Sequence, residues 1–543
     1  MREWFLAGAL VLAVCGLAAC SDDDDDNDVA PDDGDAAAAE LSVTPAGRYQ
    51  VDPFVFDEGA AEIVSYDAEQ RRLYVVNSNA RTVDVLDVSD PDNPMKIAAI
   101  DASAEGDSAN SVAVAEGVVA VAIEADDAQA NGKAVFYSST DYSKLGEAEV
   151  GALPDMLTFT PDGSRVLVAN EGEPSDDYDN DPEGSISVID LGGGYQMPPV
   201  TTLDFRGFND DAEALREAGV RIFGPGATPA QDFEPEYIAV SADGTRAWAS
   251  LQENNAIAVI DLEALAITDV RPLGFKDHSV AGQGIDPSNS DGFDVRTVPV
   301  LGMYQPDTIA AFEQDGERYL LTANEGDARD YDAFSEEVDV KDLALDPDAF
   351  PDAEALQADE ALGDLKVTST LGATGVETAE GEPVYDTLYA YGARSFSIRR
   401  ADSAELVYDS GDDFERITGE RYGDAYNNDN TENDGDSRSD NKGPEPEAIA
   451  YGEIDNRAYA FIGLERMGGF LVYDISDVTA PAFVTYVNNR DLDADPEAGS
   501  AGDLGPESIV FIAAADSPEP GTPMLAVGNE ISGSTTLYRL GGE

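Results

Sequence analysis

Short apolar runs recur along the chain, and turns rich in Gly, Pro, Asn and Asp separate them. No long segment keeps the period of an amphipathic helix. When the runs are aligned, an internal repeat emerges, with clear copies in "PDMLTFTPDGSRVLVANEG" from Pro154 and "PEYIAVSADGTRAWASLQENNAIAVIDL" from Pro235. In both of these copies a Pro-acid pair opens a strand, a turn ending in Asp-Gly reverses the chain, and a second strand ends near an acidic residue. A third strand ends at Ile-Asp-Leu or a similar triplet, and a more polar fourth strand follows.

Seven copies of this unit predict an all-β fold, a seven-bladed β-propeller of four-stranded antiparallel blades. The copies begin at Ala61, Asn110, Pro154, Pro235, Pro306, Pro446 and Pro506, and the first two match the repeat less well. The last copy stops after its third strand, near Leu540. The stretch "LSVTPAGRYQV", which precedes the first copy, is therefore expected to supply the fourth strand and close the ring.

Long inserts account for the spacing of the copies, which exceeds the roughly 40–45 residues of compact propeller repeats. Such inserts are expected to lie on one face, and they are residues 171–184, 206–234, 275–305, 327–386 and 411–445. A short helix is expected at "DDAEALREAGV", within the second insert. The fourth insert splits the fifth unit, whose outer strands are expected to resume at "TLYAYGARSFSI".

The N-terminus has the pattern of a lipoprotein signal peptide over residues 1–20. One Arg precedes an apolar run too short to span a membrane, and the ending Leu-Ala-Ala-Cys resembles a bacterial lipobox that would make Cys20 the lipidated first residue. An ordinary cleaved signal is the alternative. Residues 21–41 are expected to form an acidic, disordered tether, and residues 42–543 the propeller domain. The protein is therefore predicted to be exported and lipid-anchored to the bacterial cell envelope, on the outer-membrane or periplasmic side.

The charge balance narrows the choice of partners. Lys and Arg total 31 against 111 Asp and Glu, which gives a formal net charge of −80. Such a surface repels nucleic acid, whose binding depends on Lys and Arg contacts to phosphate, so no nucleic-acid partner is expected. We interpret most of the acids as the hydrated, mutually repelling surface of a halophilic protein. We expect the protein to be a monomer and to be attached to the membrane by its lipid anchor.

A subset of the acids recurs at fixed places in the repeat. In a propeller blade the start of the first strand and the end of the second strand lie on the same face, so two sets of carboxylates would crowd one mouth of the central channel. Carboxylates at such short distances repel one another, and this arrangement is unfavourable unless cations are bound between them. The mature chain has one histidine, His278, and no cysteine pair, so oxygen ligands and Ca²⁺ are favoured over zinc, with Mg²⁺ second. The candidate metal ligands are Asp155, Glu171, Glu236, Asp307, Glu325, Glu447, Glu465, Glu507 and Glu530. The alternative is that these acids only cap blades.

Basic residues are scarce, so those in or beside the inserts are candidates for a role in chemistry. They include Arg206 and Lys442, and the candidates for a catalytic role are Arg329, Arg394, Arg438 and Arg466. Arg and a divalent metal together are the usual clamp for a phosphoryl or carboxylate group, which would make a small anionic ligand or substrate suitable. The alternative is that each Arg neutralises neighbouring acids. No Ser-His triad or phosphate-binding glycine loop accompanies them.

Several long motifs resemble the choice-of-anchor I family, and they occur in order over about residues 49–541. They include "ANEGEPSDDYDNDPEGSISVIDL", "TANEGDARDYD", "SRSDNKGPEPEAIAYG" and "GLERMGGFLVYDI". The resemblance implies an exported bacterial β-propeller attached to a surface, with the lipobox as the anchor of this member. It also implies a distant similarity to calcium-dependent propeller phosphatases and phytases.

Two functions therefore stay open. The first is a ligand- or cation-binding scaffold with an acidic metal-binding face. The alternative is a calcium-dependent phosphoesterase, similar to alkaline phosphatase or phytase, in which the metal activates a water and an Arg stabilises the developing charge. Arg side chains that face the metal would favour the enzyme. Arg side chains buried against insert acids would favour the scaffold.

Overall fold

The computed structural model describes residues 41–542 of the chain. The predicted signal peptide, Cys20 and almost all of the predicted tether lie outside the described residues. Within residues 41–542, no helix is both long and apolar enough to cross a membrane.

Sheets of four antiparallel strands repeat along the described chain, as expected for a β-propeller. In order, they are β2 (Val64–Asp67), β3 (Arg72–Asn77), β4 (Thr82–Asp87) and β5 (Met95–Asp101); β6 (Ala109–Ala115), β7 (Val118–Ile123), β8 (Asn131–Ser138) and β9 (Lys144–Ala152); β10 (Pro154–Phe159), β11 (Arg165–Asn170), β12 (Ser185–Asp190) and β13 (Val200–Asp204); β14 (Pro235–Val240), β15 (Arg246–Leu251), β16 (Ala256–Asp261) and β17 (Ala266–Pro272); β20 (Ile309–Gln314), β21 (Glu317–Asn324), β30 (Ser395–Arg400) and β31 (Leu406–Asp409); β32 (Pro446–Ile454), β33 (Arg457–Leu464), β34 (Phe470–Asp474) and β35 (Ala482–Val487); and β36 (Pro506–Ile512), β37 (Met524–Asn529), β38 (Ser534–Gly542) and β1 (Leu41–Gln50).

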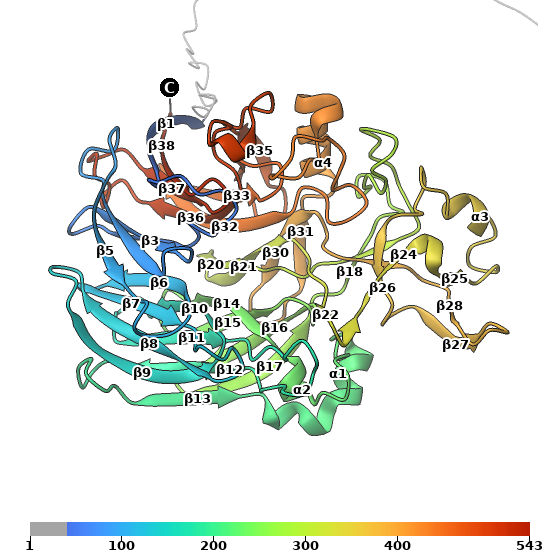
Figure 1. Ribbon diagram of the computed structural model, residues 1–543, viewed down its shortest axis with the longest axis horizontal. Helices are drawn as coiled ribbons and strands as arrows, with labels where there is room; N and C mark the ends of the chain where they lie inside the picture. Colours follow the sequence, from blue (N-terminus) through green and yellow to red (C-terminus); the bar gives the residue numbers. More distant parts are fainter. Residues whose placement is uncertain (1–40, 543) are drawn as a thin grey trace, which may run out of the picture. The chain divides into compact units, whose positions relative to one another are not determined.

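The first strands of these sheets are neighbours in chain order. Strand β2 lies beside β6, and the series continues through β10, β14, β20 and β32 to β36, which lies beside β2 again. Figure 1 shows the sheets arranged around this inner set of strands. Strand β1 pairs with β38, from Leu41 opposite Gly542 to Gln50 opposite Ser534, so the predicted closure by the N-terminal strand is confirmed.

The pattern of burial explains why these segments form sheets of this kind. The second strand of a unit is buried on both faces, as in β7, where every residue is buried, while the fourth strand is largely exposed, as in β5. Apolar side chains of adjacent sheets pack together between them. Leu167 and Ile186 of one sheet, for example, share a core with Ile238 and Ala249 of the next. Burial of this apolar surface is the main stabilising term.

Two of the inserts join to form a sheet of their own. Residues 275–305 contribute β18 (Phe275–Asp277) and β19 (Leu301–Met303), and residues 327–390 contribute β24 (Glu337–Asp339), β26 (Lys366–Thr368) and β29 (Tyr389–Ala390). This sheet has a separate core that includes Val340, Leu365 and Val367. The same insert, residues 327–390, also contains shorter elements: β22 (Asp330–Tyr331), β23 (Phe334–Ser335), β25 (Ala344–Leu345), β27 (Ala373–Glu377), β28 (Pro383–Tyr385), η2 (Val340–Asp342) and α3 (Ala353–Leu356).

The structure therefore refines the predicted course of the fifth unit. Tyr389 and Ala390 of "TLYAYGARSFSI" belong to the insert sheet, and only the residues from Ser395 onward, in β30, return to the four-stranded sheet. The helix expected in the second insert is present as α1 (Ala212–Ala218). The other helices are η1 (Arg206–Asp211), α2 (Pro229–Asp232), α4 (Asp413–Tyr422), η3 (Gly423–Ala425) and η4 (Pro496–Ala498), and α4 was not predicted from the sequence.

Candidate metal centre

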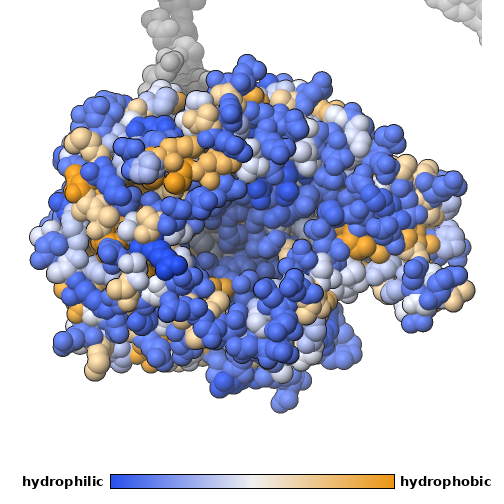
Figure 2. Space-filling model, viewed as in Figure 1, coloured by the Kyte–Doolittle hydropathy of each residue, from blue (hydrophilic) through white to orange (hydrophobic). Residues whose placement is uncertain are grey.

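A cavity of about 420 Å³ opens where the first strands meet. Figure 2 shows it as a hollow among hydrophilic residues near the middle of the visible face. Residues from six of the sheets line it, and the lining includes no Lys or Arg. Its acidic lining residues are Glu62, Asp155, Glu171, Glu173, Glu236, Glu253, Asp307, Asp327, Glu507 and Glu530. Of the predicted metal ligands, Asp155, Glu171, Glu236, Asp307, Glu507 and Glu530 therefore share one cavity.

A recurrent β-bulge follows the Pro-acid pairs. In β10 the register shifts between Pro154 and Leu157, and the same shift follows the Pro-acid pair of β14, β32 and β36. Proline has no N–H to give to the ladder, and a bulge re-aims the side chains beside it. The repeat "Pro-acid" thus places a carboxylate at the inner edge of each of these sheets.

Two groups of three carboxylates converge. Oxygens of Asp307, Glu447 and Glu507 lie within 4.8 Å of one another, and so do oxygens of Glu325, Glu447 and Glu465. Glu447 is common to both groups. The predicted ligands that do not line the cavity, Glu325, Glu447 and Glu465, are therefore brought together beside it.

The two groups differ in their basic neighbours. Lys442 Nζ lies 2.6 Å from Glu325 Oε1, and Arg466 Nη2 lies 3.2 Å from Glu465 Oε1. Among residues 41–542, by contrast, no Lys or Arg forms an ion pair with Asp307, Glu447 or Glu507. The second group is thus compensated by the chain itself, while the first is not.

The predicted metal ligands and the acidic residues that line the cavity are called the ring acids below. Burial raises the pKa of several of them. It raises the pKa of Glu62 and Asp155 to about 8, and the pKa of Glu530 to about 7. Burial, and after it the neighbouring carboxylate of Asp307, raises the pKa of Glu447 well above its usual range. Burial thus opposes ionisation of these carboxyl groups near neutral pH, and a cation beside them would favour the charged form.

Glu445 is the exception among these acids. It is fully buried, and Arg438 Nη2 (2.8 Å), Arg466 Nε (3.1 Å) and Lys442 Nζ (3.4 Å) surround its carboxylate. Burial opposes ionisation, but Lys442, Arg466 and Arg438 together lower the pKa of Glu445 to about 2. Two of the four candidate arginines are therefore engaged with one buried carboxylate.

The other two candidate arginines hold the inserts. Arg329 is buried, with Nη1 2.5 Å from Asp232 Oδ1 and Nη2 2.8 Å from Glu234 Oε2. Arg394 is also buried, and its Nη1 lies 2.6 Å from Glu415 Oε1.

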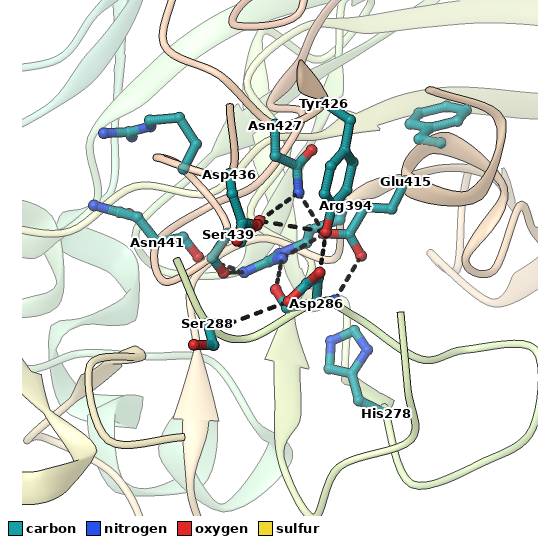
Figure 3. Close-up of polar contacts among 12 residues, drawn as sticks. His278, Asp286, Ser288, Arg394, Glu415, Tyr426, Asn427, Asp436, Ser439 and Asn441 are labelled. Atoms are coloured by element: carbon teal, nitrogen blue, oxygen red, sulfur yellow. Dashed lines mark hydrogen bonds and ion pairs between the residues drawn. The ribbon is translucent and has the colours of Figure 1, made fainter. Parts of the chain in front are cut away.

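Figure 3 shows how Arg394 joins two inserts. It donates to the backbone oxygens of Asp286, Ser439 and Asn441 as well as to Glu415. The single histidine, His278, is buried near this network, with its Nδ1 2.6 Å from the carbonyl oxygen of Gln283. Burial lowers the pKa of His278 to about 3, so it is a neutral structural residue.

Four acids of the site were not among the residues predicted from the sequence. Glu173 and Asp327 line the cavity from the inserts, and Glu234 and Glu445 each lie two residues before a ring acid. The last two could have been found, because the triplet Glu-Pro-Glu occurs at both places. Nothing in the local pattern distinguishes Glu173 or Asp327 from the solvated acids of the same loops.

Two buried oxygens of the cavity wall have no hydrogen-bond partner among the described residues. They are Oε2 of Glu236 and Oε2 of Glu253, whose side chains are 8% and 7% exposed. Because an unpaired buried carboxylate oxygen is costly, these atoms also indicate that the cavity is suited to a cationic ligand.

The comparison with protein families decides the affiliation of the chain. The model of the choice-of-anchor I domain matches residues 62–478. The chain belongs to this family. The resemblance seen in the sequence motifs is therefore confirmed, and membership fits export and attachment at a surface.

Two animal proteins are similar to parts of this family member. Gigasin-3a of Magallana gigas is 32% identical over 186 residues, which are 32% of this chain and 65% of the relative. The mesenchyme-specific cell surface glycoprotein of Strongylocentrotus purpuratus is 26% identical over 339 residues, which are 54% of this chain and 43% of the relative. The matched regions thus span less than two thirds of the length of either relative.

Two solved structures are distantly similar to the chain. Hydrazine synthase of Kuenenia stuttgartiensis aligns over 90% of this chain and 97% of its own, with a TM-score of 0.47 and 13% identity. The β-propeller domain of Myceliophteria thermophila Cps50 (Swd1) aligns over 92% of this chain and 99% of its own, with a TM-score of 0.43 and 8% identity.

Proposed function

We propose that this choice-of-anchor I protein is an exported, envelope-anchored scaffold whose central acidic face binds Ca²⁺. The observation that carries the proposal is the convergence of Asp307, Glu447 and Glu507 within 4.8 Å, without a basic partner in the described chain. Three carboxylates so placed repel one another, and a cation between them removes the repulsion.

Calcium suits this group better than other metals. Carboxylate oxygens are hard ligands, and Ca²⁺ accepts them in flexible sets completed by water, whereas Mg²⁺ demands nearly ideal octahedral geometry. Asp307, Glu447 and Glu507 would hold the ion at the start of three successive first strands. A cation there would tie β20, β32 and β36 together at the inner edge of the sheets.

We also propose that the four-stranded sheets form one ring of seven blades. The neighbour relations of the first strands support this, since they run in chain order and return from β36 to β2. The pairing of β1 with β38 gives the last sheet its fourth strand from the N-terminal end. A lipid on Cys20 would then anchor the ring through the acidic tether.

The arginines favour the scaffold over the phosphoesterase. Arg329 and Arg394 are buried in ion pairs with acids of the inserts, and Arg438 and Arg466 are directed at Glu445. An arginine that stabilises a transferring phosphoryl group must be free to face the metal. The side chains that would complete the enzyme therefore have other partners.

Calorimetric titration of Ca²⁺ into chelator-stripped protein tests the proposal. We expect saturable binding that weakens strongly in Asp307→Asn and Glu507→Gln, while the exposed control Glu263→Gln binds as the wild type does. Binding equal in all variants, or no binding, would refute the site. A phosphomonoester assay on the same samples addresses the alternative, because calcium-dependent turnover lost in Asp307→Asn would establish the enzyme.

A further inference from the structure

The repeat allows two corners of the acidic ring to be compared. The corner around β32 is formed by Glu325, Glu445, Glu447 and Glu465, and the corner around β14 by Glu171, Glu234, Glu236 and Glu253. The first three members correspond in order: the end of the preceding unit's second strand and the two acids of Glu-Pro-Glu. At the end of the same unit's second strand, Gln252 takes the place of Glu465, and Glu253 is the next residue. Three carboxylates of each corner therefore occupy equivalent positions, and Glu253 is particular to the β14 corner.

In the β32 corner the chain supplies an alkylammonium. Lys442 Nζ lies 2.6 Å from Glu325 Oε1, 3.4 Å from Glu445 Oε2 and 3.6 Å from Asp327 Oδ1, and its side chain is 13% exposed. An ammonium on a short alkyl chain is thus accommodated among ring carboxylates.

In the β14 corner the charges are not balanced in this way. Arg329 lies against Glu234, but within residues 41–542 no Lys or Arg forms an ion pair with Glu171, Glu236 or Glu253. All three line the cavity. Glu236 and Glu253 are more than nine-tenths buried, and each has one oxygen without a hydrogen-bond partner.

The close groups of three carboxylates lie elsewhere in the ring. Among the described residues, only the two groups that contain Glu447 bring three carboxylates within 4.8 Å of one another. The three carboxylates around Lys442 are not such a group, yet they hold its ammonium. An ammonium therefore does not need so close a group, and Glu171, Glu236 and Glu253 do not form one.

The cavity also has room and apolar surface for an alkyl chain. Its volume of about 420 Å³ lies within the roughly 300–1,000 Å³ of small-molecule sites. Ile63, Met156 and Tyr237 line it, each directly after a ring acid. An ammonium carries three N–H donors, which matches three carboxylates.

We propose that Glu171, Glu236 and Glu253 bind the ammonium of a primary alkylamine in the central cavity. The inference rests on the proposed cation-binding function of the ring, but it concerns a different corner from the calcium site. A free diamine and a lysine side chain of a partner carry the same group, so the source is decided by experiment.

The test is a calorimetric titration of cadaverine into the purified full-length protein in excess Ca²⁺. Cadaverine is expected to bind saturably. Glu236→Gln and Glu253→Gln are each expected to lower the affinity for cadaverine about tenfold or more, because each removes one hydrogen bond between charged groups. The control Glu263→Gln changes an exposed acid outside the cavity and should leave binding unaltered. A Gly-Lys-Gly peptide, titrated in parallel, distinguishes the sources: tighter binding of the peptide indicates a partner's lysine, and tighter binding of cadaverine a free diamine.

A second probe keeps the test decisive if the variants fold poorly. Pentamethonium, in which both nitrogens of cadaverine are trimethylated, has the same two charges and the same alkyl chain but no N–H donor, so the wild type should bind it at least about tenfold more weakly. Equal binding of the two cations would mean attraction to the net charge alone and would overturn the inference. So would amine binding that Glu236→Gln and Glu253→Gln leave intact. Failure of the calcium proposal is separate, because Ca²⁺ binding is measured independently and depends on Asp307 and Glu507.

Discussion

Lys442 is the cation that the chain itself places in the acidic ring, and its removal is the most informative perturbation. Its side chain is 13% exposed, and it pairs with Glu325 at 2.6 Å and Glu445 at 3.4 Å. Burial opposes its charge, but Glu325 and Glu445 raise the pKa of Lys442 well above its usual range. Removing one partner of such a buried pair leaves an uncompensated charge, which costs about 3–5 kcal/mol.

In Lys442→Gln the group of Glu325, Glu447 and Glu465 loses its ammonium neighbour and becomes able to accept a metal ion. We expect the free energy of unfolding in chelator to fall by about 3–5 kcal/mol. We also expect Ca²⁺ to restore about 2.7 kcal/mol when it is present at a hundred times the dissociation constant of the new site. The calcium stoichiometry should rise by one.

Urea denaturation of wild type and Lys442→Gln, in chelator and in Ca²⁺, measures these changes. Lys341 is the matched control, because its ion pairs with Asp339 and Asp364 are at the surface and Lys341→Gln should change little. A loss of stability in Lys442→Gln no larger than in the control, or one that Ca²⁺ does not restore, would show that Lys442 does not neutralise this group of carboxylates.

Three further predictions concern pH, the inserts and the anchor. Because burial raises the pKa of Glu62 and Asp155 to about 8, the folded state holds protons that the unfolded chain releases near pH 4 to 4.5. The unfolding free energy in chelator should therefore fall as pH rises from about 4.5 to about 8. Ca²⁺ should flatten this dependence, and denaturation at a series of pH values checks both. Arg394→Met leaves Glu415 buried without its partner and should cost about 3–5 kcal/mol, with faster amide exchange in 275–305 and 411–445; unchanged exchange there would contradict its role. Cys20→Ala should release the protein from the membrane fraction, and retention at wild-type levels would argue against the lipid anchor.

The four-stranded units could be predicted because most of them carry signals of their own. The Pro-acid opening, the Asp-Gly turns and the alternation of apolar runs are local signals. The last unit ends after its third strand, which predicted that the N-terminal strand β1 completes it. The acidic ring followed from the repeat, since equivalent positions in equivalent sheets must lie on one face.

The inserts were harder because their contacts are not local. Strands β19 and β29 pair although 85 or more residues separate them, and no turn signal connects the two. The arginines likewise form ion pairs and hydrogen bonds with residues that are distant in the sequence. Arg329 reaches Asp232, 97 residues earlier, and Arg394 joins residues of two inserts. Sequence spacing within each loop contains no trace of these partners.

A crystal structure of the protein grown with Ca²⁺ would show directly whether the acidic ring binds calcium. We predict an ion bound by oxygens of Asp307, Glu447 and Glu507 at about 2.3–2.6 Å, with water completing its shell. A well-ordered ring in which these three carboxylates contact only one another and water, at a calcium concentration that saturates the protein in solution, would contradict the account.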